Sequence, residues 1–278
     1  MEKMGLSQEQ IDSVISLISI GKFQDALEKT AILDQKYPGE SLLSNISGAC
    51  YQGLGQFEMA VECYEKAITI NPSYYKAYYN LGGILQDLGK LNASIECFEK
   101  ALSIKPDYAD ANNNIGNVFK ELGQFDNAIK SFEKTIEVKP DYAEAHYSLG
   151  QIFQDLDNIE AAIKSYEVVL AIKPDFAELH NNLGVIYQGV GKLDSALHHL
   201  EDAVRIMPEF AEAFNNLGNV YKELNQPNRA LDCYKSAVAI NPNYTDAHYE
   251  LGNILKGLGH LDKAVESYQK ALIIEQDK

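Results

Sequence analysis

The four cysteines are the first residues of this sequence whose type suits nucleophilic or metal chemistry. They show no C-x-x-C spacing, and three of them recur at multiples of the spacing from Cys63 to Cys97, where related segments carry serine or histidine. We expect small packing residues, with a metal or disulfide site as the alternative. The four are Cys50, Cys63, Cys97 and Cys233.

The six histidines are the candidates for acid–base chemistry. His146, His180 and His248 recur at multiples of the same spacing, which is typical of a packing position. His198 and His199 have no nucleophile or metal-ligand pattern beside them, so we expect solvated surface, as for His260. The sequence therefore predicts no catalytic residue, metal or cofactor, and no enzyme activity.

Carboxamide side chains follow this spacing as well. Asparagine is a poor helix former, so its repeated use in a helix needs a reason. Each carboxamide has donors and acceptors and can bind a peptide backbone whatever its side chains; the alternative is hydrogen bonding between neighbouring helices. One set is Asn80, Asn114, Asn182 and Asn216, and a second is Asn117, Gln151, Asn219 and Asn253. Ile46, Ser148 and Glu250 interrupt these series.

A tyrosine series and an acidic series accompany the carboxamides. Tyr79, Tyr147 and Tyr249 could offer flat rings to a ligand, or could be solvated helix surface. Asp87, Glu121, Asp155 and Glu223 lie where helix C-termini are expected, and acids are unfavourable there. Lys120, Lys222 and Lys256 precede such positions and partly offset them, so we expect a modestly acidic binding face.

Net charge limits the partners. The chain of 278 residues has 24 Lys+Arg against 40 Asp+Glu, a net charge of −16. Nucleic acid and acidic membrane surfaces are therefore disfavoured. No apolar run approaches the roughly 20 residues of a membrane helix, and no signal peptide is evident. We expect a cytoplasmic protein whose ligand is a neutral to basic protein or peptide.

A repeat of constant length must position all these side chains. It is marked by Gly48, Gly82, Gly116, Gly150, Gly184, Gly218 and Gly252, which are evenly spaced, and by a proline series from Pro38 to Pro242. With these glycines at position 8 of each repeat, residues 1–6 form a lead-in and 7–278 the array. The units are 7–40, which is degenerate, and 41–74, 75–108, 109–142, 143–176, 177–210, 211–244 and 245–278. Such periodicity predicts a solenoid.

Each unit predicts two helices. A glycine inside a helix costs about 1 kcal/mol against alanine, so we expect close helix packing at position 8, against the small residue at position 20. Position 15 is mostly glycine, as expected just past a helix end, with Asp157 and Asn225 as replacements. Acidic pairs such as Asp107-x-x-Asp110 and Asp175-x-x-Glu178 resemble capping boxes at the start of the first helix.

Leu183-Gly184, Tyr187, Ala196, Ala203 and Pro208 together resemble the tetratricopeptide repeat (TPR). The resemblance covers 7–278 and implies an all-α fold, a right-handed superhelical α-solenoid of eight helix-turn-helix units, whose first helices line a concave groove. The Asn-Leu-Gly segments are similar to arrays of O-linked N-acetylglucosamine transferases and of bacterial TPR-transferase fusions.

The leading functional interpretation is a non-catalytic scaffold that binds an extended peptide or protein segment in this groove. The chaperone-tail clamp of some related proteins needs basic residues that are lacking here. The alternatives are the substrate-recruiting arm of a glycosyltransferase or sulfotransferase, and a self-assembling structural protein. For self-assembly we expect an open face on the last helix. The residues of that face are Ala264, Tyr268, Ala271 and Leu272.

Overall fold

The computed structural model describes residues 5–276, which form sixteen α-helices and no strand. Residues 1–4 of the predicted lead-in and the last two of the final repeat lie outside the described residues. The helices pack as two compact units, one ending at Ile152 and one beginning at Phe153. They are α1 Gln8–Ser19, α2 Phe23–Lys36, α3 Ser41–Gly53, α4 Phe57–Ile70, α5 Tyr75–Asp87, α6 Leu91–Ile104, α7 Ala109–Glu121, α8 Phe125–Val138, α9 Ala143–Asp155, α10 Ile159–Ile172, α11 Ala177–Gly189, α12 Leu193–Ile206, α13 Ala211–Glu223, α14 Pro227–Ile240, α15 Thr245–Gly257 and α16 Leu261–Gln276.

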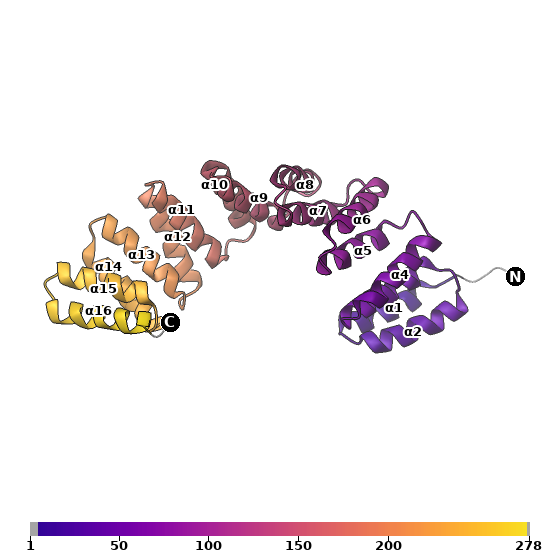
Figure 1. The fold of residues 1–278 in the computed structure, drawn as a ribbon, viewed down its shortest axis with the longest axis horizontal. Helices are drawn as coiled ribbons and strands as arrows, with labels where there is room; N and C mark the ends of the chain where they lie inside the picture. Colours follow the sequence, from indigo (N-terminus) through magenta and orange to yellow (C-terminus); the bar gives the residue numbers. More distant parts are fainter. Residues whose placement is uncertain (1–4, 277–278) are drawn as a thin grey trace. The chain divides into compact units, whose positions relative to one another are not determined.

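Helices pair as hairpins along the chain, and the fold is an α-solenoid of helix-turn-helix units (Figure 1). The turn within a hairpin needs a left-handed residue, and the expected residues supply it. Gly123 has φ 69°, and Asp157 and Asn225 have φ 57° and 55°. Pro227 occupies the first turn of α14, where its missing N–H costs nothing.

The helix-interior glycines meet the predicted small residue, since Oγ of Ser94 donates to the carbonyl of Gly82 at 2.7 Å, and they also make room for a large side chain of the partner helix. A Cβ on Gly116 would lie 2.8 Å from Cε1 of Phe132, a ring that is fully buried. A Cβ on Gly218 would likewise lie 2.6 Å from Cε1 of Tyr234. The close approach is therefore confirmed, and it also accommodates the bulky residue at position 24. The small residue at position 20, such as Ala128, is buried beside it.

The cores of the second to seventh hairpins are built around these position-24 side chains. Tyr64, Phe98, Phe132 and Tyr234 are among the largest fully buried residues. In the first compact unit, Tyr64 of α4 packs with Leu81, Ile84 and Leu85 of α5, so one hairpin is joined to the next through apolar contacts. The stacking surface is thus apolar, and the remaining surface of the first helices is free for polar residues.

The capping boxes predicted at Asp107-x-x-Asp110 and Asp175-x-x-Glu178 are absent. The N-cap of α7 is Tyr108 and that of α11 is Phe176, and neither makes a side-chain cap hydrogen bond. Asp107 and Asp175 lie one residue too early to cap. Asp110 and Glu178 still lie in the first turn, where an acid interacts favourably with the helix dipole. The box Ser7-x-x-Gln10 at α1 is present with both of its hydrogen bonds.

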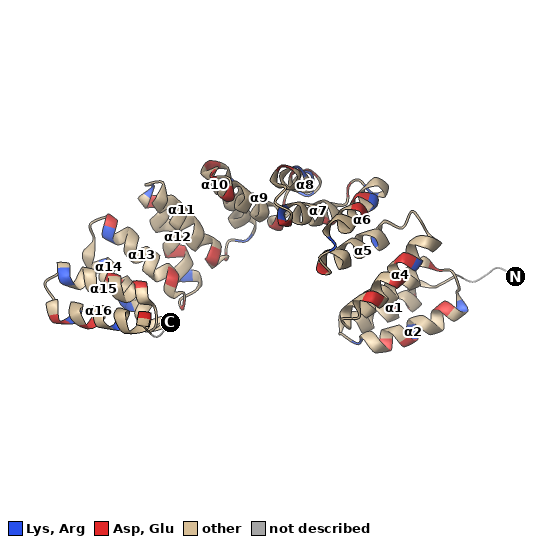
Figure 2. Ribbon diagram, in the orientation of Figure 1, with Lys and Arg blue, Asp and Glu red and all other residues tan. Residues whose placement is uncertain are grey.

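Charge is spread widely over the helices. Acidic residues occur on helices of both units and are not gathered in one run (Figure 2). Among the described helices none combines the length and the apolar character that a membrane crossing requires.

Candidate functional site

Asparagines at position 6 hydrogen-bond to the first helix of the preceding repeat. Nδ2 of Asn80 donates to Oδ1 of Asn45 at 3.0 Å, which joins α5 to α3. Asn114 of α7 donates to the hydroxyl of Tyr79 at 3.1 Å. Asn216 of α13 repeats the contact with Asn181 of α11, at 3.0 Å. These three side chains therefore have the helix-to-helix role that the sequence offered as the alternative to ligand binding.

Structural hydrogen bonding leaves much of each carboxamide unused. A carboxamide has two donors and an oxygen that accepts two hydrogen bonds, and the contacts of Asn80, Asn114 and Asn216 each use one donor. Asn182, at the same position of α11, is exposed and has no side-chain hydrogen bond within the described part of the chain. The position-6 series thus retains unused hydrogen-bonding groups on the polar side of the first helices.

The carboxamides at position 9 also make hydrogen bonds within the fold. Oδ1 of Asn219 accepts from the hydroxyl of Tyr234, and Oδ1 of Asn253 from that of Tyr268, both at 2.8 Å. Gln151 accepts from Nζ of Lys120 at 2.7 Å. Asn117 is half-buried. These contacts fix the carboxamides beside the position-6 series and orient their free amide groups.

The acidic residues of this face are mostly solvated. Glu121 is exposed, as are Asp87 and Glu223. Lys222 forms an ion pair with Glu250 of α15, Nζ to Oε2 2.7 Å. The acidic character expected of the face therefore remains at its position-13 residues.

The tyrosines of position 5 differ from one another. Tyr79 packs against Tyr108, with ring centroids 4.9 Å apart, and burial raises the pKa of its phenol. Tyr147 is half-buried. Tyr249 is 56% exposed, so its ring is the one of the three best placed to meet a ligand.

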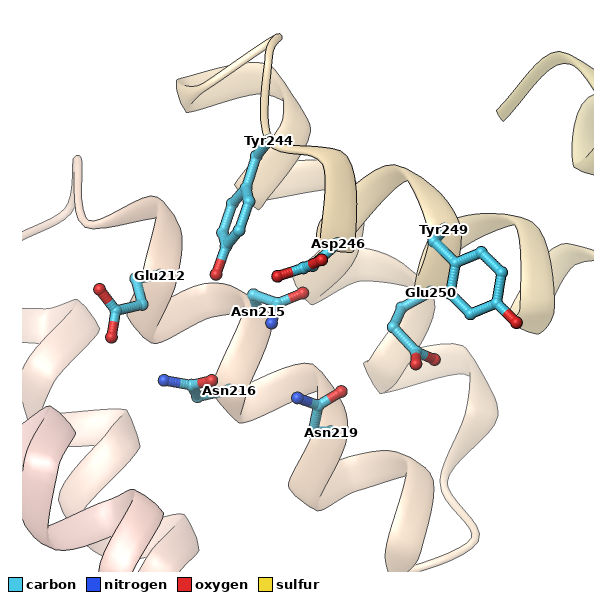
Figure 3. Close-up of a pocket in the computed structure, with 8 residues that line it drawn as sticks. All are labelled: Glu212, Asn215, Asn216, Asn219, Tyr244, Asp246, Tyr249 and Glu250. Atoms are coloured by element: carbon cyan, nitrogen blue, oxygen red, sulfur yellow. The ribbon is translucent and has the colours of Figure 1, made fainter. Parts of the chain in front are cut away.

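A pocket of about 410 Å³ lies between α13 and α15 of the second unit (Figure 3). It unites three residues singled out from the sequence, Asn216, Asn219 and Tyr249, with five others. The full lining is Glu212, Asn215, Asn216, Asn219, Tyr244, Asp246, Tyr249 and Glu250. Asn215 was missed as a site residue. Its signal was the asparagine at position 5 of four repeats: Asn45, Asn113, Asn181 and Asn215.

Two of the three histidines at position 4 are buried packing residues, as predicted, whereas His146 is half-buried. His180 and His248 are 7% and 4% exposed, and each ring binds the carbonyl oxygen of the proline six residues earlier. The prediction of solvated surface was wrong for His199. Its ring stacks on Tyr187 at 5.4 Å, and its Nδ1 lies 3.1 Å from that of His180. Burial and the neighbouring His180 and His198 lower the pKa of His199 to about 4.

The cysteines are free thiols that fill the core or its border, as expected for packing residues. Burial is the main cause that raises the pKa of Cys50 to about 11 and that of Cys233 to about 12. The thiols are therefore protonated at neutral pH and poor nucleophiles.

The open face predicted on the last helix has a different composition. Ala264 and Ala271 are buried within the α15–α16 hairpin, at 2% and 6% exposure, because they are the small residues of its own interface. Tyr268 is half-buried and bonded to Asn253. Leu272 is 57% exposed, and it is joined by Leu261 and Val265 at 62% and 53%.

Family models match most of the chain. A model described as TPR repeat matches residues 50–89, 83–123, 116–157, 155–191 and 218–259. Two models described as tetratricopeptide repeat match 245–278 and 179–207. None of the curated proteins compared with the chain matches it.

Solved structures with the same fold are numerous. A crystal structure of MamA is 27% identical, with a TM-score of 0.56, over 59% of this chain and 95% of MamA. YrrB, described as a TPR protein with an unusual peptide-binding site, is 24% identical, with a TM-score of 0.59, over 67% of this chain and 96% of its own. The C-terminal part of a TPR repeat-containing protein from Cytophaga hutchinsonii is 20% identical, with a TM-score of 0.73, over 86% of this chain and 98% of that part.

The constant repeat length, the sixteen described helices and the matched family models agree with one another. The chain belongs to the tetratricopeptide repeat family.

Proposed function

We propose that the chain is a protein-interaction scaffold that binds an extended peptide or protein segment on the polar side of its first helices. The observation that carries this proposal is the series of carboxamides at position 6, which keep unused donors and acceptors after their structural contacts. An extended segment presents a backbone N–H and C=O at each residue, and carboxamides complement both groups. YrrB, whose peptide-binding site is named in its description, has the same fold.

The ligand is neutral to basic. Exposed acids border the carboxamides, among them Asp87 and Glu121 of the first unit and Glu223 of the second. Opposite charges across an interface steer association and exclude like-charged partners. An acidic segment would meet these carboxylates without a base of its own to pair with them.

Two asparagines give a matched test of ligand binding against structural bonding. Peptides selected from a phage-displayed random library are titrated by fluorescence anisotropy against wild type, Asn182→Ala and Asn216→Ala. Both variants are expected to weaken binding about tenfold, the size of one or two hydrogen bonds. Only Asn216→Ala, which loses its bond to Asn181, is expected to lower stability, by about 1 kcal/mol. Unchanged affinity in both variants would refute the role of the carboxamides.

Recruitment of substrate to a glycosyltransferase or sulfotransferase is the version of this function suggested by the Asn-Leu-Gly segments. The same faces would then bind the substrate of a catalytic domain. The natural reading frame tests this: a transferase domain encoded with these repeats supports it, and a frame without one refutes it.

Self-association is a second candidate, favoured by the exposed face of α16. Leu261, Val265 and Leu272 correspond, at six repeats' distance, to Phe57, Val61 and Ile68 of α4. Those three are partly buried beside the α5 residues of the next hairpin, whereas the α16 residues are exposed. We propose that a second copy of the chain covers this face.

Analytical ultracentrifugation tests self-association. Wild type is expected to form dimers or longer species as its concentration rises, and Leu272→Glu to remain monomeric. Val185→Glu, at a residue 43% exposed on α11, is the control. A monomeric wild type at high concentration would refute this candidate.

A further inference from the structure

The pocket between α13 and α15 contains a buried acceptor that nothing satisfies. Asn215 is 5% exposed, and its Oδ1 has no hydrogen-bond partner among residues 5–276. A buried polar atom without a partner costs about 1–3 kcal/mol. In Figure 3 this oxygen points toward the carboxylate of Asp246, which is itself an acceptor. Two acceptors that face one another call for a donor between them.

Three carboxylates also line the pocket. Glu212 accepts from Asn181 at 3.1 Å, so one oxygen of its carboxylate is used. Glu250 accepts through Oε2 from Lys222 and, at 3.4 Å, from Asn253. Asp246 is exposed and has no ion pair in the described part of the chain. Lys222 is thus the base that offsets one of three carboxylates.

Tyrosines complete the pocket. Burial raises the pKa of the Tyr244 phenol, and the carboxylates of Glu212 and Asp246 raise it further, which reflects the negative potential inside. The ring of Tyr249 is 56% exposed at the rim and packs on that of Tyr268, with centroids 5.8 Å apart.

Part of this arrangement recurs three repeats earlier in the first unit. Asn113 corresponds to Asn215, is 6% exposed, and also has an Oδ1 without a partner among the described residues. Around it stand Asp110 and Tyr142, which correspond to Glu212 and Tyr244. There the hydroxyl of Tyr142 donates to Asp110 at 3.0 Å, so that acid is partly satisfied. At Asn45 and Asn181 the asparagine at position 6 of the next repeat supplies this donor, whereas that position is Ser148 after Asn113 and Glu250 after Asn215. Both oxygens are therefore left for another donor.

We propose that the α13–α15 pocket binds the guanidinium group of an arginine in the bound segment. This proposal rests on the proposed function, and it names one residue type that the bound segment must contain. A guanidinium carries five N–H donors in one plane and no acceptor, and it is more weakly hydrated than an ammonium. It donates to Oδ1 of Asn215 and to the carboxylate of Asp246 together.

Small probes test the pocket without any knowledge of the natural segment. N-acetyl-arginine N-methylamide is titrated into the full chain by NMR, beside the analogues of citrulline, which has the same shape without charge, and of lysine. The arginine probe is expected to bind about tenfold or more tightly than either, the size of a charge-assisted hydrogen bond. Equal binding of the citrulline probe or of the lysine probe would overturn the proposal.

Variants give the second arm of this test. Asp246→Asn and Asn215→Leu are each expected to weaken the arginine probe about tenfold. Glu178→Gln, which removes the same charge at the same repeat position of α11 outside the pocket, is expected to leave it unchanged. Asn215→Leu is also expected to keep or raise the thermal midpoint, because it removes an unsatisfied buried oxygen. A marked fall in stability would give Asn215 a structural role and overturn its assignment here.

The two proposals fail in different ways. Selected peptides that bind, and that lose affinity in Asn182→Ala, while the arginine probe binds no better than citrulline, would refute the pocket and leave the scaffold function. A probe that binds in the pocket while no extended peptide is captured would refute the scaffold function.

Discussion

Two adjacent glycines in α5 give opposite predictions for the same substitution. A Cβ on Gly82 would lie 2.8 Å from Cε1 and 2.9 Å from Cδ1 of Phe98, which is fully buried. Carbon atoms normally approach to about 3.5–4.0 Å. A Cβ on Gly83 would meet nothing within 4 Å. Both residues lie inside the helix, so only their surroundings differ.

The magnitudes follow from these contacts. Alanine gains about 1 kcal/mol of helix stability over glycine. In Gly83→Ala nothing opposes that gain, so this variant should be about 1 kcal/mol more stable than wild type. In Gly82→Ala the overlap with an immobile ring costs about 3 kcal/mol, the upper end for overpacking, and leaves the variant about 2 kcal/mol less stable. The two variants should differ by about 3 kcal/mol.

Urea denaturation followed by circular dichroism measures the difference. Repeat proteins lose structure repeat by repeat, so hydrogen exchange in α5 and α6 is measured beside it. The expected result is a lower midpoint and faster exchange in α5 and α6 for Gly82→Ala, with the reverse for Gly83→Ala. If both variants were equally stable, the packing of Phe98 against Gly82 would be wrong.

Two further predictions concern titratable groups. The pKa of His199 is lowered from 6.5 to about 4 in the folded chain. As pH falls, the unfolded chain therefore binds a proton at this imidazole before the folded chain does. His199 thus contributes stability above pH 6.5 that is lost as pH falls toward 4. His199→Phe should therefore lose less stability than wild type between pH 7 and pH 5 in urea titrations, with His260→Gln as control, and an unchanged pH dependence would contradict this. The pKa of the Cys233 thiol is raised to about 12. This thiol should therefore react with Ellman's reagent at pH 8 far more slowly in the folded chain than in urea. Equal rates would contradict its burial.

Sequence periodicity predicted the fold in detail because each repeat uses the same stacking residues. The glycine at position 8, the left-handed turn at Asn225 and the packing role of His248 all follow from one register. Periodicity does not say which side chains of the facing helix surround the glycine, and so the ring of Phe132 over Gly116 was not predicted beside the small residue at position 20.

Single-residue shifts account for the remaining errors. The N-cap of α7 falls on Tyr108, one residue after Asp107, and a shift of one residue removes a capping box. His199 differs from the exposed His198 by one position, yet it packs on Tyr187. The pocket was missed because its buried acceptor, Asn215, becomes unusual only once the partners of its oxygen are known.

Ligand contact with the carboxamides of the first helices is the central claim, and side-chain amide NMR tests it most directly. A selected peptide is titrated into ¹⁵N-labelled protein, and the Nδ2 signals of Asn182, Asn216 and Asn228 are followed. Asn182 and Asn216 lie on first helices, and Asn228 is exposed on α14. We predict that the signals of Asn182 and Asn216 shift in proportion to the bound fraction while that of Asn228 stays in place. A bound peptide that leaves both first-helix signals unmoved would contradict the account.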